Sequence, residues 1–172
     1  LSNSGRISAG TNFAIANTGS IGTFTNTGSL THTGATAISN EGAITTFNNS
    51  QGKSGTNPVT FIKSLPTNYN VIVNSTNDYG QIEFSDFAGE SNTSLNFGVH
   101  SSSTLAASTT YSAVVDGLSS SEIASGTSGS YVSGASRFNW TLENSSGSIW
   151  DLVVGADQNI AADTSNSVTT SV

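Results

Sequence analysis

Four carboxylates in one short stretch of the chain have the greatest potential for chemistry. The densest acidic cluster of the sequence consists of Asp78, Glu83, Asp86 and Glu90. Paired carboxylates on a β-structure can act as general acid and base on a polysaccharide, and carboxylate oxygens are the ligands that Ca²⁺ prefers. Asp78 lies in a turn-forming stretch, where aspartate is common for backbone reasons, and Glu83 takes a polar position in an alternating segment. We therefore expect solvated surface charge, with a calcium site and a catalytic pair as the open alternatives.

The other candidate catalytic residues lack the partners that their chemistry needs. His32 and His100 are the only histidines. We expect His32 to face solvent between two corners of the fold rather than to act as a base for a serine. Residues 50–53 match the Ser-x-x-Lys motif of penicillin-binding enzymes, but the companion motifs are absent. Nucleophile elbows, His-Glu-x-x-His and phosphate-binding loops are absent too. The sequence therefore predicts a protein that is not an enzyme, with no metal site and no cofactor.

The composition excludes several further classes of function. The net charge is −7, from eleven acids and four scattered bases, so no basic stripe is available for nucleic acid or anionic lipid. Cysteine is absent, which excludes disulfides and thiolate chemistry. No apolar run is long enough for a membrane-spanning helix. Only 9% of the 172 residues are charged, and β-branched and aromatic residues recur in clusters, which favours one ordered β domain over disorder.

A 23-residue repeat supplies the elements that position these side chains. The two full copies, 3–25 and 26–48, are identical at nine positions, and a period of about 20–50 residues is typical of stacked architectures. Each copy contains two Asn-x-Gly-x-apolar steps. Asn and Gly tolerate positive φ, so each step predicts a corner followed by a short strand. The predicted corner residues are Asn3, Gly5, Asn17, Gly19, Asn26, Gly28, Asn40 and Gly42.

Stacking of the two copies predicts an all-β fold, a right-handed parallel β-helix with coils about 4.8 Å apart. Like side chains then lie over like, and asparagine amides such as those of Asn17 and Asn40 bond in a ladder. The predicted stacked core consists of Ile7, Ile15, Ile21, Phe24, Leu30, Ile38, Ile44 and Phe47.

After residue 48 the repeat degrades, and we expect a loop at 50–58 and larger coils from 59, so that solenoid coils fill residues 1–110. An open solenoid end needs a cap, and residues 111–155 are expected to provide it. The stretch 111–118 is compatible with one helical turn or a strand. Two alternating segments around a turn at 144–147 predict a hairpin, whose buried face is Phe138, Trp140, Leu142, Trp150, Leu152 and Val154. Residues 156–172 are expected to be a polar tail or linker.

The chain resembles the passenger domains of Gram-negative autotransporters (type V secretion). The Asn-x-Gly-x-Ile steps of 3–48 are similar to their degenerate repeats, and Leu65–Asn74 running into Asp78–Ile82 is similar to a module late in such passengers. The segments 140–142 and 149–154 resemble the region before the translocator barrel. The resemblance implies a β-helix displayed on the bacterial cell surface, whose C-terminal part folds first and templates the rest.

Three functions are compatible with these features. The first is a non-enzymatic passenger module that acts as a stalk, an adhesion surface or a self-association surface, through many weak polar contacts. Its partners would be molecules of host or neighbouring cells, or the chain itself. The second is a self-assembling extracellular fibre subunit that joins head to tail. The third, and weakest, is a polysaccharide-degrading β-helix.

Overall fold

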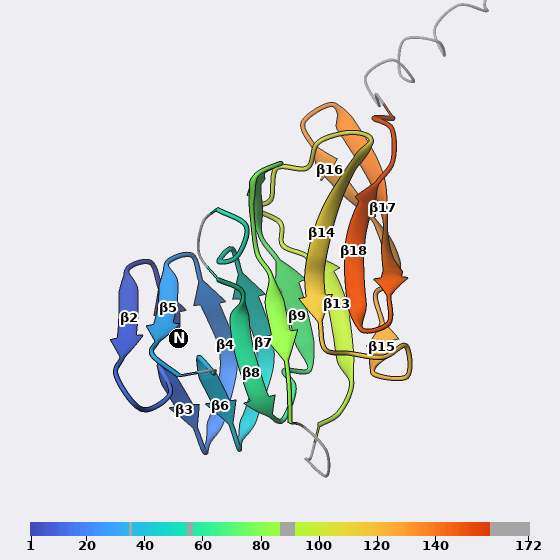
Figure 1. Ribbon diagram of the computed structural model, residues 1–172. Coiled ribbons are helices and arrows are strands. Elements are labelled where there is room, and N and C mark those ends of the chain that lie inside the picture. The colour runs from blue at the N-terminus through green and yellow to red at the C-terminus, as the bar shows by residue number, and fades with distance from the viewer. Residues whose placement is uncertain (35, 55–56, 87–91, 159–172) are drawn as a thin grey trace, which may run out of the picture.

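A computed structural model describes residues 1–34, 36–54, 57–86 and 92–158 of the protein (Figure 1). Their secondary structure is all β, in coils that wind from one end of the molecule to the other. The first coil contains β1 (Ser2–Asn3), β2 (Arg6–Ala9) and β3 (Ile15–Asn17). The second contains β4 (Ser20–Asn26), β5 (Ser29–His32) and β6 (Ile38–Asn40). The third contains β7 (Ala43–Asn49) and β8 (Val59–Lys63).

The later coils are larger and more varied. The fourth contains β9 (Asn68–Val71), β10 (Val73–Ser75), β11 (Asp78–Tyr79) and β12 (Ile82–Phe84). The next contains β13 (Leu95–Val99) and β14 (Thr109–Asp116). The last strands of the described residues are β15 (Ile123–Ser125), β16 (Ser128–Ser133), β17 (Ser136–Ser146) and β18 (Ile149–Val154).

Strands of successive coils pair in parallel, so the predicted β-solenoid is confirmed. One wall is a six-stranded sheet of order β1-β4-β7-β9-β13-β15, and a second contains the parallel run β3-β6-β8-β12-β14. A third, short wall is formed by β2 and β5 alone. Stacked residues of successive coils are 23 positions apart in the sequence from Asn3 to Asn26, and 28 positions apart from Asn68 to Asn96. The larger coils therefore begin at β9 and not at residue 59, because Val59 still pairs with Ile82, one repeat length away.

The predicted like-over-like register is confirmed. The strand pairings place Ile7 beside Leu30, Ile15 beside Ile38, Ile21 beside Ile44, and Phe24 beside Phe47. Five members of the stacked core are buried: Phe24, Leu30, Ile38, Ile44 and Phe47. Ile7, Ile15 and Ile21 are only partly buried. Ile7 and Ile15 belong to the first coil, which no described strand covers, and β1 pairs with β4 only at Thr25 and Asn26, away from Ile21.

Aromatic rings form a continuous column through the interior. Centroids along Phe24, Phe47, Tyr69, Phe97 and Trp140 are 5.1, 6.1, 5.9 and 5.7 Å apart in turn. Ring pairs at such distances contribute beyond their buried area. The column begins in the repeats and ends on the cap, so one hydrophobic core joins the two regions.

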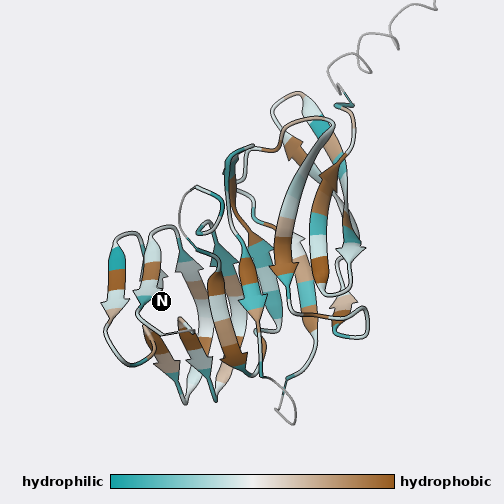
Figure 2. Ribbon diagram, in the orientation of Figure 1, coloured by the Kyte–Doolittle hydropathy of each residue, from teal (hydrophilic) through white to brown (hydrophobic). Residues whose placement is uncertain are grey.

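The predicted C-terminal hairpin is confirmed as β17–β18, and its buried face is the predicted one. Burial alternates along β18, and Figure 2 shows both hydrophobic and hydrophilic segments on this strand. The region is more extensive than the sequence indicated. The second wall continues past β14 as the antiparallel strands β18, β17 and β16, and β16 was not predicted. Residues 111–118, for which the sequence allows a helical turn or a strand, contain most of β14. Because β14 pairs in parallel with β12 and antiparallel with β18, it belongs to the solenoid and the cap together.

Candidate functional site

Two buried asparagine ladders run along the solenoid corners. In one, Asn3 Nδ2 donates to Asn26 Oδ1 at 2.9 Å, and Asn26 Nδ2 donates to Asn49 Oδ1 at 2.8 Å. In the other, Asn17 Nδ2 donates to Asn40 Oδ1 at 2.7 Å. In these two ladders the amides donate to the next coil toward the C-terminus, with acceptor oxygens toward the N-terminal end. The amides of Asn70 and Asn96 donate in the opposite direction, to Asn48 and Asn68.

The predicted corner residues lie at these corners, but the conformational reason given for them is wrong. None of the eight belongs to the described residues with positive φ. The asparagines act through their side chains, as when Asn3 Oδ1 accepts the Gly5 N–H at 3.2 Å. The glycines act through the absence of a Cβ, because coils approach closely there. A Cβ on Gly28 would lie 1.9 Å from the Gly5 carbonyl oxygen, and one on Gly42 would lie 2.0 Å from that of Gly19.

The third wall stops where the repeat loses this glycine. Gln51 follows Asn49 at the position that Gly5 and Gly28 take in the earlier copies. Its Cβ could not be accommodated against Gly28 in the same stacking, and the chain leaves the wall in the predicted loop between β7 and β8. Among the described residues this wall therefore ends at β5, and no described strand pairs with its other edge.

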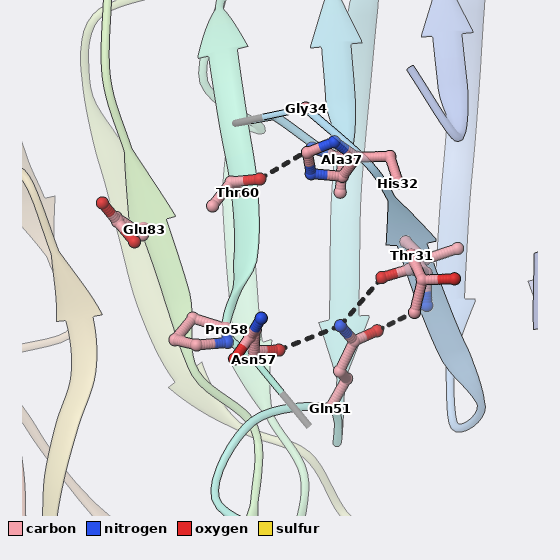
Figure 3. A pocket seen from close by; sticks show the side chains of 10 residues that line it. Thr31, His32, Gly34, Ala37, Gln51, Asn57, Pro58, Thr60 and Glu83 are labelled. Atoms are coloured by element: carbon pink, nitrogen blue, oxygen red, sulfur yellow. Dashed lines mark hydrogen bonds between the residues drawn. The ribbon is translucent and has the colours of Figure 1, made fainter. Parts of the chain in front are cut away.

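The side chain of Gln51 partly replaces the missing strand (Figure 3). Its Oε1 accepts the Leu30 N–H at 2.6 Å, and its Nε2 donates to the Leu30 carbonyl at 3.0 Å. Nε2 also donates to the Asn57 carbonyl at 3.0 Å. The carboxamide thus occupies the place of a peptide group from a neighbouring strand, and it satisfies both backbone groups of Leu30.

An open groove of about 490 Å³ lies at this edge of β5. We call it the Gln51 groove; it is lined by Leu30, Thr31, His32, Gly34, Ala37, Gln51, Asn57, Pro58, Thr60 and Glu83. Its volume is within the range of about 300–1,000 Å³ typical of ligand sites. Its lining is polar, and sequence reasoning missed it, although the replacement of the repeat glycine by Gln51 was the available signal.

The predicted carboxylates take separate places. Asp78, expected in a turn, lies on β11 and accepts a hydrogen bond from Asn74 Nδ2 at 3.1 Å. Glu83 is exposed on β12, as predicted, and lines the Gln51 groove. Asp86 is an exposed residue after β12, and Glu90 lies outside the described residues. Across the described chain, no three His, Cys, Asp or Glu side chains gather closely enough to hold a metal ion.

The histidines and the Ser-x-x-Lys match have ordinary surroundings. His32, expected in open solvent, is half-buried at the Gln51 groove. His100 is bonded through Nδ1 to Ser102 Oγ at 2.8 Å, on the surface. Ser50 is buried and Lys53 is exposed.

Three tyrosines are perturbed by burial. Tyr69 lies fully inside, and burial raises the pKa of its phenol well above the ordinary value. Its hydroxyl makes no hydrogen bond among the described residues, and the nearby Asn49 amide lowers the pKa by less than burial raises it. Burial also raises the pKa of Tyr79, whose hydroxyl donates to the Ser112 carbonyl at 3.2 Å, and of Tyr131.

No protein-family model, curated protein or solved structure matches the chain. The fold itself defines the class, a parallel β-solenoid that ends in an antiparallel sheet. In the part of the chain that the structure describes, no helix has the length and apolar character to cross a membrane.

Proposed function

We propose that the chain is the C-terminal part of a surface-displayed β-solenoid, a non-enzymatic module that serves as a stalk and as a surface for adhesion or self-association. The observation that carries this function is the difference between the two ends of the molecule. The N-terminal end presents unpaired strand edges and ladder acceptors, whereas the C-terminal end turns into an antiparallel sheet.

The N-terminal end is suited to contact with a further coil of the same kind. β1, β2 and β3 are each the terminal strand of their sheet. A Cβ added to Gly5 or to Gly19 would have no neighbour within 4 Å, although one added to the equivalent Gly28 or Gly42 would meet backbone atoms. A further coil stacked on this end would account for glycine at positions 5 and 19. The same coil would also cover the partly buried Ile7.

The C-terminal end supports a role in folding. Trp150 Nε1 donates to the Leu118 carbonyl at 2.7 Å, and Trp140 closes the aromatic column. Antiparallel hairpins need only local chain closure, whereas coils need contacts 22 or more residues apart. The hairpins β16–β17 and β17–β18 can form first by local pairing. Once β14 has paired with β18, its other edge would template the parallel coils.

The walls between the two ends support contact with other surfaces through many weak interactions. Their outward positions carry mainly Ser, Thr and Asn, and the few charges are dispersed. Avidity along such a wall can replace a single strong site. The partners proposed are molecules on host or neighbouring cells, or further copies of this chain, in an extracellular setting.

A bead assay tests the adhesive function. The chain is attached to microspheres through residue 172 at graded densities, and both clustering of the beads and their retention on cultured cells are counted. We expect a steep increase with density, because the contacts are weak and additive. Beads that cluster and adhere no better than albumin-coated beads at every density would refute it.

The open N-terminal end also favours the second candidate, a head-to-tail fibre subunit. Electron microscopy of the purified chain distinguishes the two, because the fibre predicts filaments and the stalk predicts separate particles. The antiparallel strand β16 at the other end does not present an asparagine ladder, which is why we rank the fibre second.

A further inference from the structure

We infer that the Gln51 groove binds an extended peptide segment of a partner protein, one that carries a lysine or arginine, as an added strand beside β5. This binding site is separate from the polar walls invoked above, and it does not depend on display at a cell surface.

The backbone of β5 is the first reason. In a strand, the N–H and C=O of one residue point to the same side, and those of the residue two positions on point there too. Leu30 directs both groups toward Gln51, so His32 directs its own toward the groove. Nothing in the described chain hydrogen-bonds to the His32 N–H or C=O on that side. An unpaired strand edge is a template for β-augmentation.

The second reason is that the groove already accommodates an amide in this role. The Gln51 carboxamide binds Leu30 with a donor and an acceptor, as the peptide group of an adjacent strand would. A peptide that continues along β5 from Gln51 toward His32 would extend the same pattern. It would restore the third wall at the place where the repeat lost its glycine.

The side chains of the lining select the kind of peptide. Glu83 is the one carboxylate among the lining residues, and none of them is a lysine or arginine. A cationic peptide side chain near Glu83 is therefore favoured. None of the lining residues is a phenylalanine, tyrosine or tryptophan. Sugars are commonly held by stacking on such side chains, so the lining favours a peptide over a glycan.

NMR titration of the ¹⁵N-labelled full chain tests this binding. The probe is the blocked peptide acetyl-Thr-Val-Lys-Val-Thr-amide. Few hydrogen bonds are available, so the expected dissociation constant is on the order of 1 mM. We expect the His32 amide to shift downfield, as hydrogen bonding requires, together with signals of Gln51 and Thr60.

Two N-methylated isomers of the peptide separate backbone pairing from charge attraction. Adjacent residues of a strand direct their N–H groups to opposite sides, so one isomer is methylated at the lysine and the other at the valine that precedes it. One isomer should lose binding and the other should keep it, whereas simple charge attraction predicts equal behaviour. Glu83→Gln should weaken the lysine peptide about two- to fivefold, as for an exposed ion pair. Glu143→Gln, an exposed change on β17, is the matched control and should have no effect.

Either of two results would overturn the inference. One is the absence of any His32 shift at a peptide concentration on the order of 10 mM, about tenfold above the expected dissociation constant. The other is a shift of the groove signals with the neutral oligosaccharide cellohexaose and not with the peptide. A failed bead assay leaves this result untouched, since the titration needs no cell surface.

Discussion

The first coils and the C-terminal sheet of this molecule bury their side chains through different kinds of contact. In residues 3–49 the strands pair one repeat apart, and at the conserved positions of the repeat identical residues lie side by side, as Ile21 and Ile44 or Phe24 and Phe47 do. In the region from β14 to β18 no contact recurs. Trp150 bonds to Leu118, Tyr79 packs edge-on to Tyr111, and Asp151 binds the backbone of β14, each only once.

The comparison shows how stability is distributed. In a stack, each coil contributes intrinsic and nearest-neighbour terms of similar size, so no single coil is indispensable. In the C-terminal sheet, large aromatic side chains concentrate burial at a few positions. Substitutions there should destabilise the whole chain. In the repeats, the loss of stability caused by a substitution should depend on how closely two coils approach at that position.

Truncation of Trp140 should give the largest effect. Trp140 is 7% exposed and its ring lies 5.7 Å from that of Phe97. Trp140→Ala should lower the free energy of unfolding by about 3–5 kcal/mol, measured by urea denaturation. It should also slow refolding in stopped-flow fluorescence followed through Trp150, if the C-terminal sheet forms first.

The control for this experiment lies in the repeats. Asn40→Ala removes the buried hydrogen-bond partner of Asn17 and should lower the free energy of unfolding by about 1–3 kcal/mol. It should mainly speed unfolding and leave the refolding rate close to that of the wild type. Equal slowing of refolding by the two variants would remove the distinction between the regions.

Alanine at two equivalent glycines should separate stacked from unstacked positions. In Gly42→Ala the new Cβ meets the Gly19 carbonyl oxygen at 2.0 Å, so two coils must move apart, at a cost of about 3 kcal/mol. Gly19→Ala places the same methyl group in open space and should be neutral or stabilise by up to about 1 kcal/mol. Thermal unfolding followed by circular dichroism measures both. Similar losses for the two variants would contradict the proposed close approach of the coils.

The repeat explains which parts of the structure were predictable from the sequence. Residues that make a periodic contact recur in the sequence one repeat apart, so Asn17 identifies Asn40 as its partner. The register of the first three coils follows from such pairs. The hairpin β17–β18 was predictable because alternation around a turn is a local signal. The strand β16, the parallel-to-antiparallel change at β14 and the Gln51 groove depend on contacts made once, which no periodicity records.

Removal of a buried hydroxyl should strengthen the aromatic column. Tyr69 takes a position that phenylalanine takes in the neighbouring coils, and its hydroxyl has no hydrogen-bond partner among the described residues. An unsatisfied buried polar group costs about 1–3 kcal/mol. Tyr69→Phe should therefore raise the free energy of unfolding by about 1 kcal/mol or more, measured in urea. A loss of stability would show that the hydroxyl is bonded after all, for example through Asn49.

The same substitution has a pH signature. Burial raises the pKa of Tyr69 above that of the unfolded chain, so the folded state retains a proton that the unfolded state releases above about pH 10. The free energy of unfolding should then fall as the pH rises beyond about 10, by at most about 1.4 kcal/mol per pH unit for one group. Tyr69→Phe should reduce this fall, and Tyr131→Phe, at a more exposed site, should reduce it less.

The smallest expected effect concerns the irregularity where β14 changes from parallel to antiparallel pairing. Ala113 has φ of 53°, in the left-handed region, and its N–H donates to Asp151 Oδ1 at 2.7 Å. An alanine in this conformation is strained by about 1 kcal/mol, which glycine relieves at a smaller entropic cost. Ala113→Gly should thus stabilise by a few tenths of a kcal/mol, whereas Ala124→Gly, in the exposed middle of β15, should destabilise by about 0.5–1 kcal/mol. The described positions of the repeats contain no such strained residue. If Ala113→Gly raises the free energy of unfolding and Ala124→Gly lowers it, backbone strain is located at the junction where the solenoid ends and the antiparallel sheet begins.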